Sequence, residues 1–571
     1  MQNKSCTSCS KEFIIDAADL EFYDKIAPIF DGKKFVPLPP VLCPDCRNIK
    51  RSAFRNERNL YKRKCDKSGK EIISIYSADK SDYKVYDIKE YYKDDWDALE
   101  YGRDFDFNRP FFEQFDQLLK AVPRQSLFNT MTEGCEYSNY IAACKNCYMS
   151  MICYYNTENS HFCYRVYTSK DNMDLNYCIQ VEKCYECAYS NQCFGCRNSV
   201  RLNNCRDCYL SVDLTGCNNC ILCSNLNRKE YCIRNVQYSK KEFEKLKSEF
   251  DFGSRKAVNE YLEEFEKLKL ASPVKYANLT KCEDCEGDNL VECKNSINCF
   301  DGYKLENAKN CFGEESKNIM DARGGTYEWA LECNHTGFGQ NFIGCSSTLK
   351  AHDMYYCDSC QGGHDCFGCV GLRNKEYCIF NKQYSKEEYG KLASRIAEKM
   401  IDEGVWGHFY PLELSSFGYN ETLAQVLFPK TKEEAIALGA KWQDNDYSLK
   451  FDGKFYEPLD DIKNYISSST NRDELLAGIL KCKTSEKAYR IMSQELAFYL
   501  DNSIPIPDEH YDVRFDNKFK MRTYTLYDRA CMCHGECNKH QNLCPNKFKS
   551  AYSKDSNFKV FCESCYQNII K

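Results

Sequence analysis

The amino-acid sequence predicts a multidomain α+β protein with a central, duplicated, cysteine-rich parallel β-solenoid, capping helices, and duplicated zinc-ribbon or treble-clef-like modules on either side. Three observations lead to this prediction. Cysteines recur every twelve residues in the middle of the chain, one middle segment occurs twice, and the two ends of the chain align with each other. A chain of 571 residues is long enough for several domains of this kind.

The middle segment CSNLNRKEYCIRNVQYSKKEFEKL at 223–246 returns as CVGLRNKEYCIFNKQYSKEEYGKL at 369–392. Each copy contains a Ser-x-x-Glu capping box, which predicts that a helix closes each half. A short fixed period rich in Asn and Gly is typical of a parallel β-solenoid, in which equivalent side chains stack on successive coils. We therefore expect inward-pointing, stacked thiols on coils of twelve, eighteen or twenty-four residues. The cysteines at this step include Cys184, Cys196, Cys208, Cys220 and Cys232.

The two ends of the chain are related, because residues 6–65 align with residues 482–531 and a second, shorter unit follows each copy. Matched pairs include Cys6 with Cys482, Arg47 with Arg514, Arg55 with Arg522, and Cys65 with Cys531. We expect eight segments. The N-terminal part holds a zinc-complete module at 1–64 and a degenerate unit with a helix at 65–127. The middle holds solenoid halves at 128–238 and 273–384, joined by a helical connector at 239–272. A helical and mixed segment at 385–480, a degenerate module at 481–530 and a C-terminal module at 531–571 complete the chain.

Two of the four end units retain a set of metal ligands. Two Cys-x2-Cys knuckles in the first unit place four thiolates on two tight turns, which predicts one tetrahedral zinc site. In the aligned unit Ser485 and Val513 replace two of these cysteines and His510 lies near the third position, so that site is expected to have lost its metal. The predicted N-terminal ligands are Cys6, Cys9, Cys43 and Cys46.

The C-terminal unit retains the knuckle Cys562 and Cys565, whereas Asp87 and Glu90 stand at these positions in its N-terminal counterpart. Its other ligands must come from a nearby group of thiols and imidazoles. Spacing alone does not choose among them, and we favour Cys531 and Cys544. We expect about two structural Zn2+ ions in all. The full group of alternatives is Cys531, Cys533, Cys537, Cys544, His534 and His540.

Composition limits the function classes. The net charge of -6 argues against a generally basic nucleic-acid coat. The sequence shows neither a secretion signal nor a run of about 20 apolar residues, so we expect a cytoplasmic protein that does not enter membranes. A reducing compartment disfavours disulfides, so the 40 cysteines favour metal binding and thiol packing over a secreted disulfide protein. Within the solenoid we expect thiol packing rather than metal binding or redox chemistry.

A basic stretch follows the first zinc knuckle. If it forms one helix over 47–64, its basic side chains fall on one face and are candidate nucleic-acid contacts. The alternative, which we prefer, is an internal ion-pair network with the acidic stretch 79–106. The candidate contacts are Arg47, Arg51, Arg55, Arg58 and Lys62.

No catalytic motif or phosphate-binding loop was found, so the sequence favours a protein without enzymatic activity. We expect a zinc-binding structural or interaction scaffold with an unidentified protein partner. The alternatives are a nucleic-acid-binding zinc protein and a thiol-based metal store or redox protein. The oligomeric state is not predicted.

Four segments carry a resemblance to a known family. They are CRNIKRSAFRNERNLYKRKCDKSGKEIISIYS, DFDFNRPFFEQF, CFGCVGLRNKEYCIFNKQYSKEEY and SSFGYNETLAQVLFPKTKEEA. With these the chain resembles, over nearly its whole length, a family of cysteine-rich zinc-ribbon and β-solenoid proteins of candidate-phyla bacteria and some giant viruses. The resemblance implies the architecture but no particular activity.

Overall fold

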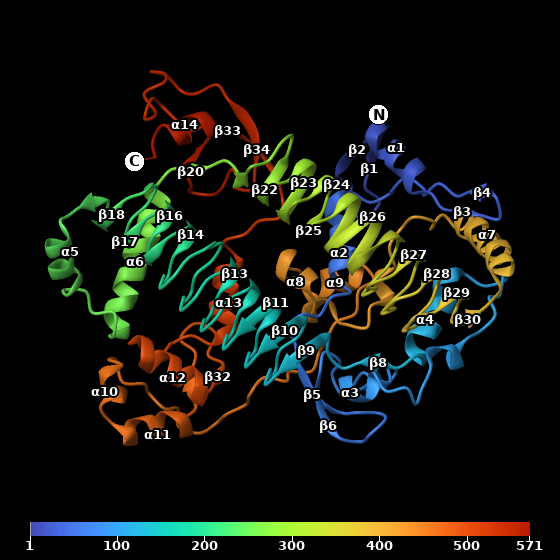
Figure 1. Cartoon of the computed structure of the whole chain (residues 1–571), viewed down its shortest axis with the longest axis horizontal. Coiled ribbons are helices and arrows are strands. Elements are labelled where there is room, and N and C mark those ends of the chain that lie inside the picture. Colours follow the sequence, from blue (N-terminus) through green and yellow to red (C-terminus); the bar gives the residue numbers. More distant parts are fainter. Residues whose placement is uncertain (1, 571) are drawn as a thin grey trace.

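A computed structural model describes residues 2–570 and shows a mixed α+β protein built around two runs of β-solenoid (Figure 1). The runs lie side by side and proceed in opposite directions, and Arg165 of the first forms an ion pair with Asp301 of the second at 3.2 Å (Figure 1). The strands of the first run are β9 (Asn129–Glu133), β10 (Ile141–Lys145), β11 (Met151–Glu158), β12 (Tyr164–Tyr167), β13 (Asn176–Ile179), β14 (Val200–Asn203), β15 (Arg206–Tyr209), β16 (Val212–Thr215), β17 (Asn218–Ile221), β18 (Glu230–Ile233) and β19 (Val236–Gln237). Those of the second are β21 (Leu279–Thr280), β22 (Glu286–Val291), β23 (Lys294–Tyr303), β24 (Glu306–Lys309), β25 (Phe312–Glu314), β26 (Lys317–Ile343), β27 (His352–Tyr355), β28 (His364–Phe367), β29 (Glu376–Ile379) and β30 (Lys382–Gln383).

Each regular coil holds twelve residues. Strands of successive coils are parallel, and Cys208 pairs with Cys220, which pairs in turn with Cys232. In the second run Cys366 pairs with Cys378 in the same way. The predicted stacking of thiols at the twelve-residue step is therefore confirmed, and the longer coils of eighteen and twenty-four residues are excluded for these strands.

A coil has four sides of three residues, because every third residue adopts a left-handed backbone conformation. In the coil 177–188 these residues are Tyr177 (φ 57°), Gln180 (φ 51°), Lys183 (φ 50°) and Glu186 (φ 50°). This conformation is unfavourable for residues other than Gly, Asn and Asp. Hydrogen bonds between coils hold the backbone there, since the N–H of Glu186 donates to the carbonyl oxygen of Met173 at 3.2 Å.

Most side chains that point into the coil are small and carry a polar atom that bonds to the backbone, whereas Leu202 and Leu214 stack at one inward position of successive coils. The thiol of Cys208 lies 3.3 Å from the carbonyl oxygen of Arg206 and 3.7 Å from that of Cys217. The hydroxyl of Ser199 makes equivalent contacts, at 2.8 Å to Arg197 and 3.2 Å to Cys208. Cysteine and serine interchange at inward positions because both are small and both donate to a carbonyl two residues before or nine residues after.

Four small units surround the solenoid, and each consists of a β-hairpin followed further along the chain by a helix. Unit 1 contains β1 (Gln2–Ser5), β2 (Glu12–Ile15) and α2 (Pro44–Ser52); unit 2 contains β5 (Tyr61–Lys64), β6 (Glu71–Ser74) and α3 (Ile88–Tyr91). Unit 3 contains β31 (Leu480–Lys481), β32 (Ala488–Tyr489) and α13 (Tyr511–Phe519); unit 4 contains β33 (Tyr527–Ala530), β34 (Lys547–Ser550) and α14 (Glu563–Gln567). A knuckle in the hairpin and another at the start of the helix is the treble-clef arrangement.

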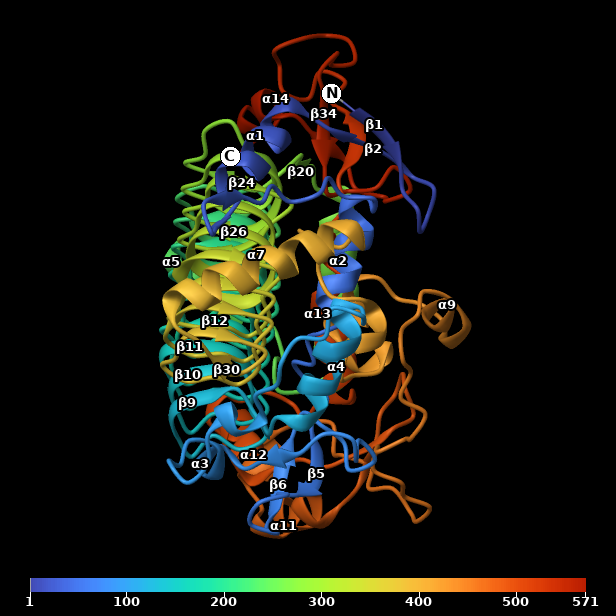
Figure 2. The same ribbon diagram turned by 90° about the vertical axis from the view of Figure 1, so that its right-hand side faces the viewer.

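The units are distributed over opposite sides of the solenoid. Units 1 and 4 lie together on one side, and units 2 and 3 lie on the other, in both views of the molecule (Figures 1 and 2). Both chain termini are on the side of units 1 and 4 (Figure 2).

Units 2 and 4 each pair with the segment that leads into a solenoid run. In unit 2, β7 (Val85–Tyr86) pairs in parallel with β8 (Arg124–Gln125), just before the first run. In unit 4, β35 (Val560–Phe561) pairs in parallel with β20 (Val274–Lys275), just before the second run. The duplication seen in the sequence therefore extends to the way the units are attached.

Helices and short strands fill the remaining chain. They are α1 (Ala17–Ile26), β3 (Ile29–Phe30), β4 (Lys33–Lys34), α4 (Phe111–Ala121), α5 (Lys240–Lys247), α6 (Arg255–Ala271), α7 (Lys386–Asp402), α8 (Leu423–Leu427), α9 (Lys432–Ala437), α10 (Lys463–Ile466), α11 (Ser469–Ala477) and α12 (Ser493–Asn502). The predicted capping boxes at the starts of α5 and α7 are present. Within residues 2–570 no helix combines the length and the apolar character that crossing a membrane requires.

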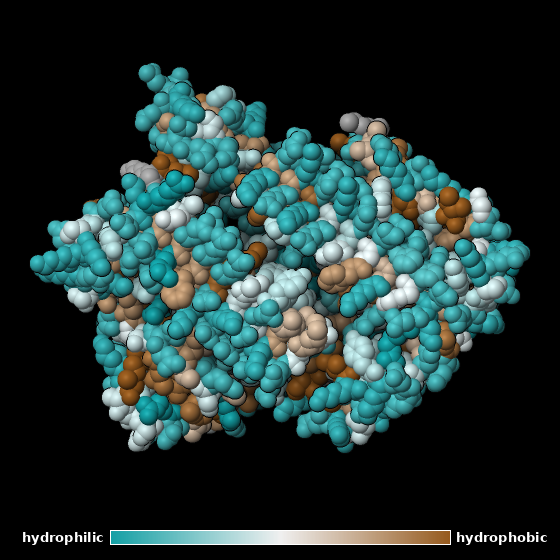
Figure 3. Space-filling view, in the orientation of Figure 1, coloured by the Kyte–Doolittle hydropathy of each residue, from teal (hydrophilic) through white to brown (hydrophobic). Residues whose placement is uncertain are grey.

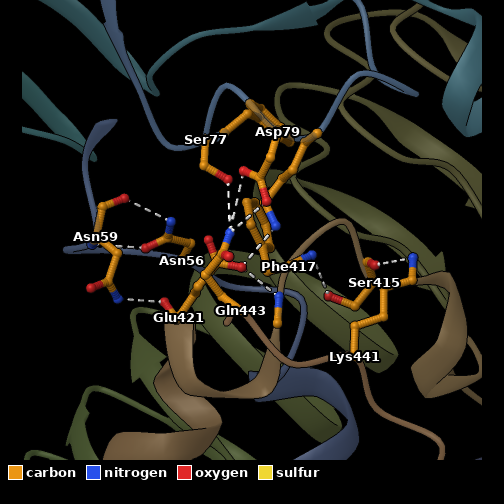
Figure 4. A network of polar contacts seen from close by, with 12 residues as sticks. Asn56, Asn59, Ser77, Asp79, Ser415, Phe417, Glu421, Lys441 and Gln443 are labelled. Carbon is orange, nitrogen blue, oxygen red and sulfur yellow. Dashed lines mark hydrogen bonds and ion pairs between the residues drawn. The ribbon is translucent and has the colours of Figure 1, made fainter. Parts of the chain in front are cut away.

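The segment after α7 is tied to unit 2 by a network of polar contacts (Figure 4). Its centre is the buried Glu421, whose carboxylate accepts from the hydroxyl of Tyr61 and the ammonium of Lys80, both at 2.8 Å. The amide of Gln443 donates to the Ser77 hydroxyl at 3.0 Å (Figure 4). Unit 2 is thus held by chain segments more than 300 residues away in sequence, since Tyr61 and Glu421 are 360 residues apart.

The coil geometry predicts which replacements of Cys208 are tolerated. Cys208→Ser retains a small donor and is expected to leave the melting temperature nearly unchanged. Cys208→Leu adds volume inside a closed coil, and overpacking of this kind costs about 1–3 kcal/mol. Arg206→Leu, on the exposed neighbouring position, is the control. Calorimetry of the full chain measures all three, and equal melting temperatures for the Ser and Leu variants would contradict this description of the interior.

Candidate metal centres

Unit 1 brings its four cysteines together. Cys6 and Cys9 lie in the loop of the β1–β2 hairpin, Cys43 caps the N-terminus of α2, and Cys46 lies in the first turn of that helix. All four sulfur atoms lie within 4.8 Å of one another, and those of Cys9 and Cys43 are 3.6 Å apart. Zn–S bonds of about 2.3 Å in a tetrahedron place sulfur atoms about 3.8 Å apart, so the set fits a tetrahedral ion.

One thiol of this set, that of Cys43, has a lowered pKa. A hydrogen bond from the Cys46 thiol lowers the pKa of Cys43 to about 5, although burial opposes the change. The position of Cys43 at a helix N-terminus favours the thiolate further. A thiolate at neutral pH is the form that binds a metal.

Unit 4 brings together Cys531, Cys544, Cys562 and Cys565, the combination that we favoured among the alternatives. Cys562 caps α14, and the sulfur atoms of Cys544 and Cys562 are 3.9 Å apart. Burial acts to raise the pKa of Cys562, but hydrogen bonds, the largest from the side chain of Asn546, bring it down to about 7. The donors of this set are therefore buried, close together, and include one that ionises readily.

A second set of donors overlaps the first. Cys533, Cys537 and His540 lie with Cys565 in a group whose ligand atoms are all within 4.8 Å of one another. Cys533, Cys537 and His540 were all predicted as candidate ligands, but as alternatives for a single site. The spacing Cys537-x2-His540 was the signal for a further knuckle.

Units 2 and 3 keep only the first cysteine of the pattern, and backbone N–H groups point at its sulfur. The donors are Ser68 and Asp87 to Cys65, at 3.4 and 3.3 Å, and Ser485 and His510 to Cys482, at 3.4 and 3.2 Å. No four-donor group was found in these two units among the described residues.

Apolar packing replaces the metal in unit 3. Its residues Leu480, Leu496 and Tyr499 belong to one buried cluster with Met173 and Tyr185 of the first solenoid run. The small core of this unit is thereby continuous with the outer surface of the solenoid.

The basic stretch after the first knuckle does not form one helical face, so the predicted helix over 47–64 is wrong. Helix α2 ends at Ser52. The chain then turns to the first solenoid run, where the Asn139 amide donates to the carbonyl oxygens of Asn56 and Glu57 at 3.3 and 3.2 Å. Arg55, Arg58 and Lys62 consequently lie beyond the helix.

Most of these basic side chains are engaged in ion pairs. Those with buried partners are Arg47 with Asp321 at 2.9 Å, Arg51 with Glu332 at 2.5 Å, and Arg55 with Glu57. Arg58 pairs with Asp512 at 3.0 Å, and Lys62 is exposed. The preferred ion-pair network is present, but its expected partners in 79–106 are wrong, because carboxylates of the second solenoid run face α2 directly.

A comparison with known protein-family models and with curated proteins found no match to this chain.

The buried ion pairs predict a large effect for Arg51 and a small one for Lys62. Arg51→Met leaves the two buried carboxylates of Asp321 and Glu332 facing Arg47 alone, and an uncompensated buried charge of this kind costs about 3–5 kcal/mol. Lys62→Met removes an exposed charge and is the matched control. Thermal unfolding of the two full-length variants measures the difference, and similar melting temperatures would contradict the packing of α2 against the second run.

Proposed function

We propose that the protein is a zinc-stabilised, non-catalytic scaffold that presents a rigid surface to a protein partner. The observation that carries the proposal is that the closed four-cysteine sets lie in units built into the solenoid pair. Unit 1 inserts Arg47 and Arg51 between carboxylates of the second run, and unit 4 extends the segment before that run through β35. Four sulfur donors without an open position suit a structural zinc ion.

The surface supports recognition through polar contacts. In the space-filling view, hydrophilic residues cover most of the visible face and hydrophobic ones gather only in small, separate patches (Figure 3). Units 1 and 4 project on the same side of the solenoid (Figure 2). A partner that contacts this side would meet two metal-stabilised units held at a fixed separation.

The observed contacts favour this proposal over the two alternatives. The guanidinium groups of Arg47, Arg51 and Arg55 are buried against carboxylates, so they are poorly placed for phosphate contacts. Solenoid thiols such as Cys208 donate to backbone carbonyls, a use that suits packing better than metal storage.

The equivalent positions of units 1 and 3 supply a matched test of the zinc assignment. Cys6→Ser removes one of four ligands and is expected to release one zinc ion per chain. Cys482→Ser changes the aligned residue of a unit without a donor set and is expected to release none. Elemental analysis of the purified full chain, with zinc present during expression, measures both.

The loss of zinc from Cys6→Ser should also loosen unit 1. A structural zinc site supplies on the order of 10 kcal/mol of apparent binding energy to a small fold. Limited proteolysis is expected to cleave this variant within residues 2–52 while the Cys482→Ser variant stays resistant there. Equal zinc contents for native protein and Cys6→Ser would refute the assignment.

A further inference from the structure

We propose that unit 4 holds two metal ions in a dinuclear centre in which the thiolate of Cys565 bridges them. This inference deepens the proposed function, because it rests on the assignment of structural zinc to the end units. It concerns the number of ions and the role of one ligand, neither of which follows from the spacing of the knuckles.

The loop between β33 and β34 carries most of the ligands. Residues 531–546 leave β33 and return to β34, whose first pair is Ala530 with Lys547. Cys565 reaches this loop from the first turn of α14. The loop supplies Cys531, Cys533, Cys537, His540 and Cys544.

The number of donors matches two ions that share one ligand. Each of the two sets contains four donors, and Cys565 is the only member of both. Two tetrahedral zinc ions need eight coordination positions, and seven donors fill them when one thiolate binds both ions. With a single ion in the first set, the remaining three donors would lie grouped beside it without a metal.

The orientation of His540 supports the second ion independently. Its Nδ1 lies 2.6 Å from the carbonyl oxygen of Asn542, so Nδ1 carries the proton and donates it there. The lone pair of Nε2 then faces two sulfur atoms, with Cys565 at 3.2 Å and Cys537 at 3.3 Å. A metal-ligating imidazole is held in this way, since its other nitrogen donates to a backbone carbonyl.

The packing of unit 4 also supports a second ion. Its buried cluster consists of the six cysteines together with Phe561 and Tyr566. Few apolar contacts therefore hold the 531–546 loop, and within it the first set uses only Cys531 and Cys544, near the two ends of the loop. An ion bound to Cys533, Cys537 and His540 fixes the middle of the loop against α14.

Elemental analysis of the native full chain tests the proposal first. Three zinc ions per chain are expected, one in unit 1 and two in unit 4, and a total of two would overturn the dinuclear centre. His540→Ala is expected to reduce the total from three to two. His534→Ala, an exposed histidine of the same loop outside both donor sets, is the control and should retain three.

The bridge itself is tested by replacing zinc with ¹¹³Cd in the native protein. Three cadmium resonances are expected, and the two from unit 4 should share a cadmium–cadmium coupling because a single sulfur atom joins these ions. Three resonances without any such coupling would overturn the bridging role of Cys565. This measurement needs no variant, so it holds even if Cys565→Ser does not fold.

The outcomes separate this inference from the proposed function. A total of two ions, one of them lost in Cys6→Ser, would refute the dinuclear centre and leave the zinc-stabilised scaffold intact. A native protein without bound zinc would refute both.

Discussion

The narrow interior of the twelve-residue coil is the constraint on which the rest of the structure depends. A coil of four three-residue sides needs a left-handed backbone at every third residue, a conformation that L side chains adopt at a cost. Its interior is filled mostly by thiols and hydroxyls that bond to carbonyl oxygens, with leucines such as Leu202 and Leu214 among them. The abundance of cysteine in the middle of the chain thus suits this geometry.

The end units dock on the two solenoid runs through buried ion pairs. Unit 1 places Arg47 and Arg51 on Asp321 and Glu332 of the second run, whereas unit 3 places Arg514 and Lys518 on Asp174 of the first. The aligned helices therefore dock in equivalent ways on opposite runs. These buried charges are tolerated because each faces opposite charges, and the loss of one would leave part of its group uncompensated.

Local spacing was sufficient to predict the features that depend on nearby residues. The twelve-residue step fixed the stacking of Cys208 and Cys220, and the knuckles identified the four cysteines of unit 1. The end of α2 at Ser52 was not predicted, and the chain after it contacts Asn139 of a solenoid coil, which is distant in sequence. The partners of Arg51 lie 270 and 281 residues away, beyond the reach of charge patterning along the chain. The second donor set was missed because Cys565 belongs to two sets, which only coordinates reveal.

Unit 1 lies near the start of the chain but docks on the second solenoid run, and this has a consequence for synthesis of the protein. When Arg51 leaves the ribosome, its partner Glu332 lies 281 residues downstream. At about 5–20 residues per second, translation needs roughly 14–56 s to deliver it. During that interval the nascent N-terminal unit carries uncompensated guanidinium groups and an open helix face. Binding of metal at Cys6, Cys9, Cys43 and Cys46 needs no downstream residue, so it can give this unit a fixed shape before its docking surface exists.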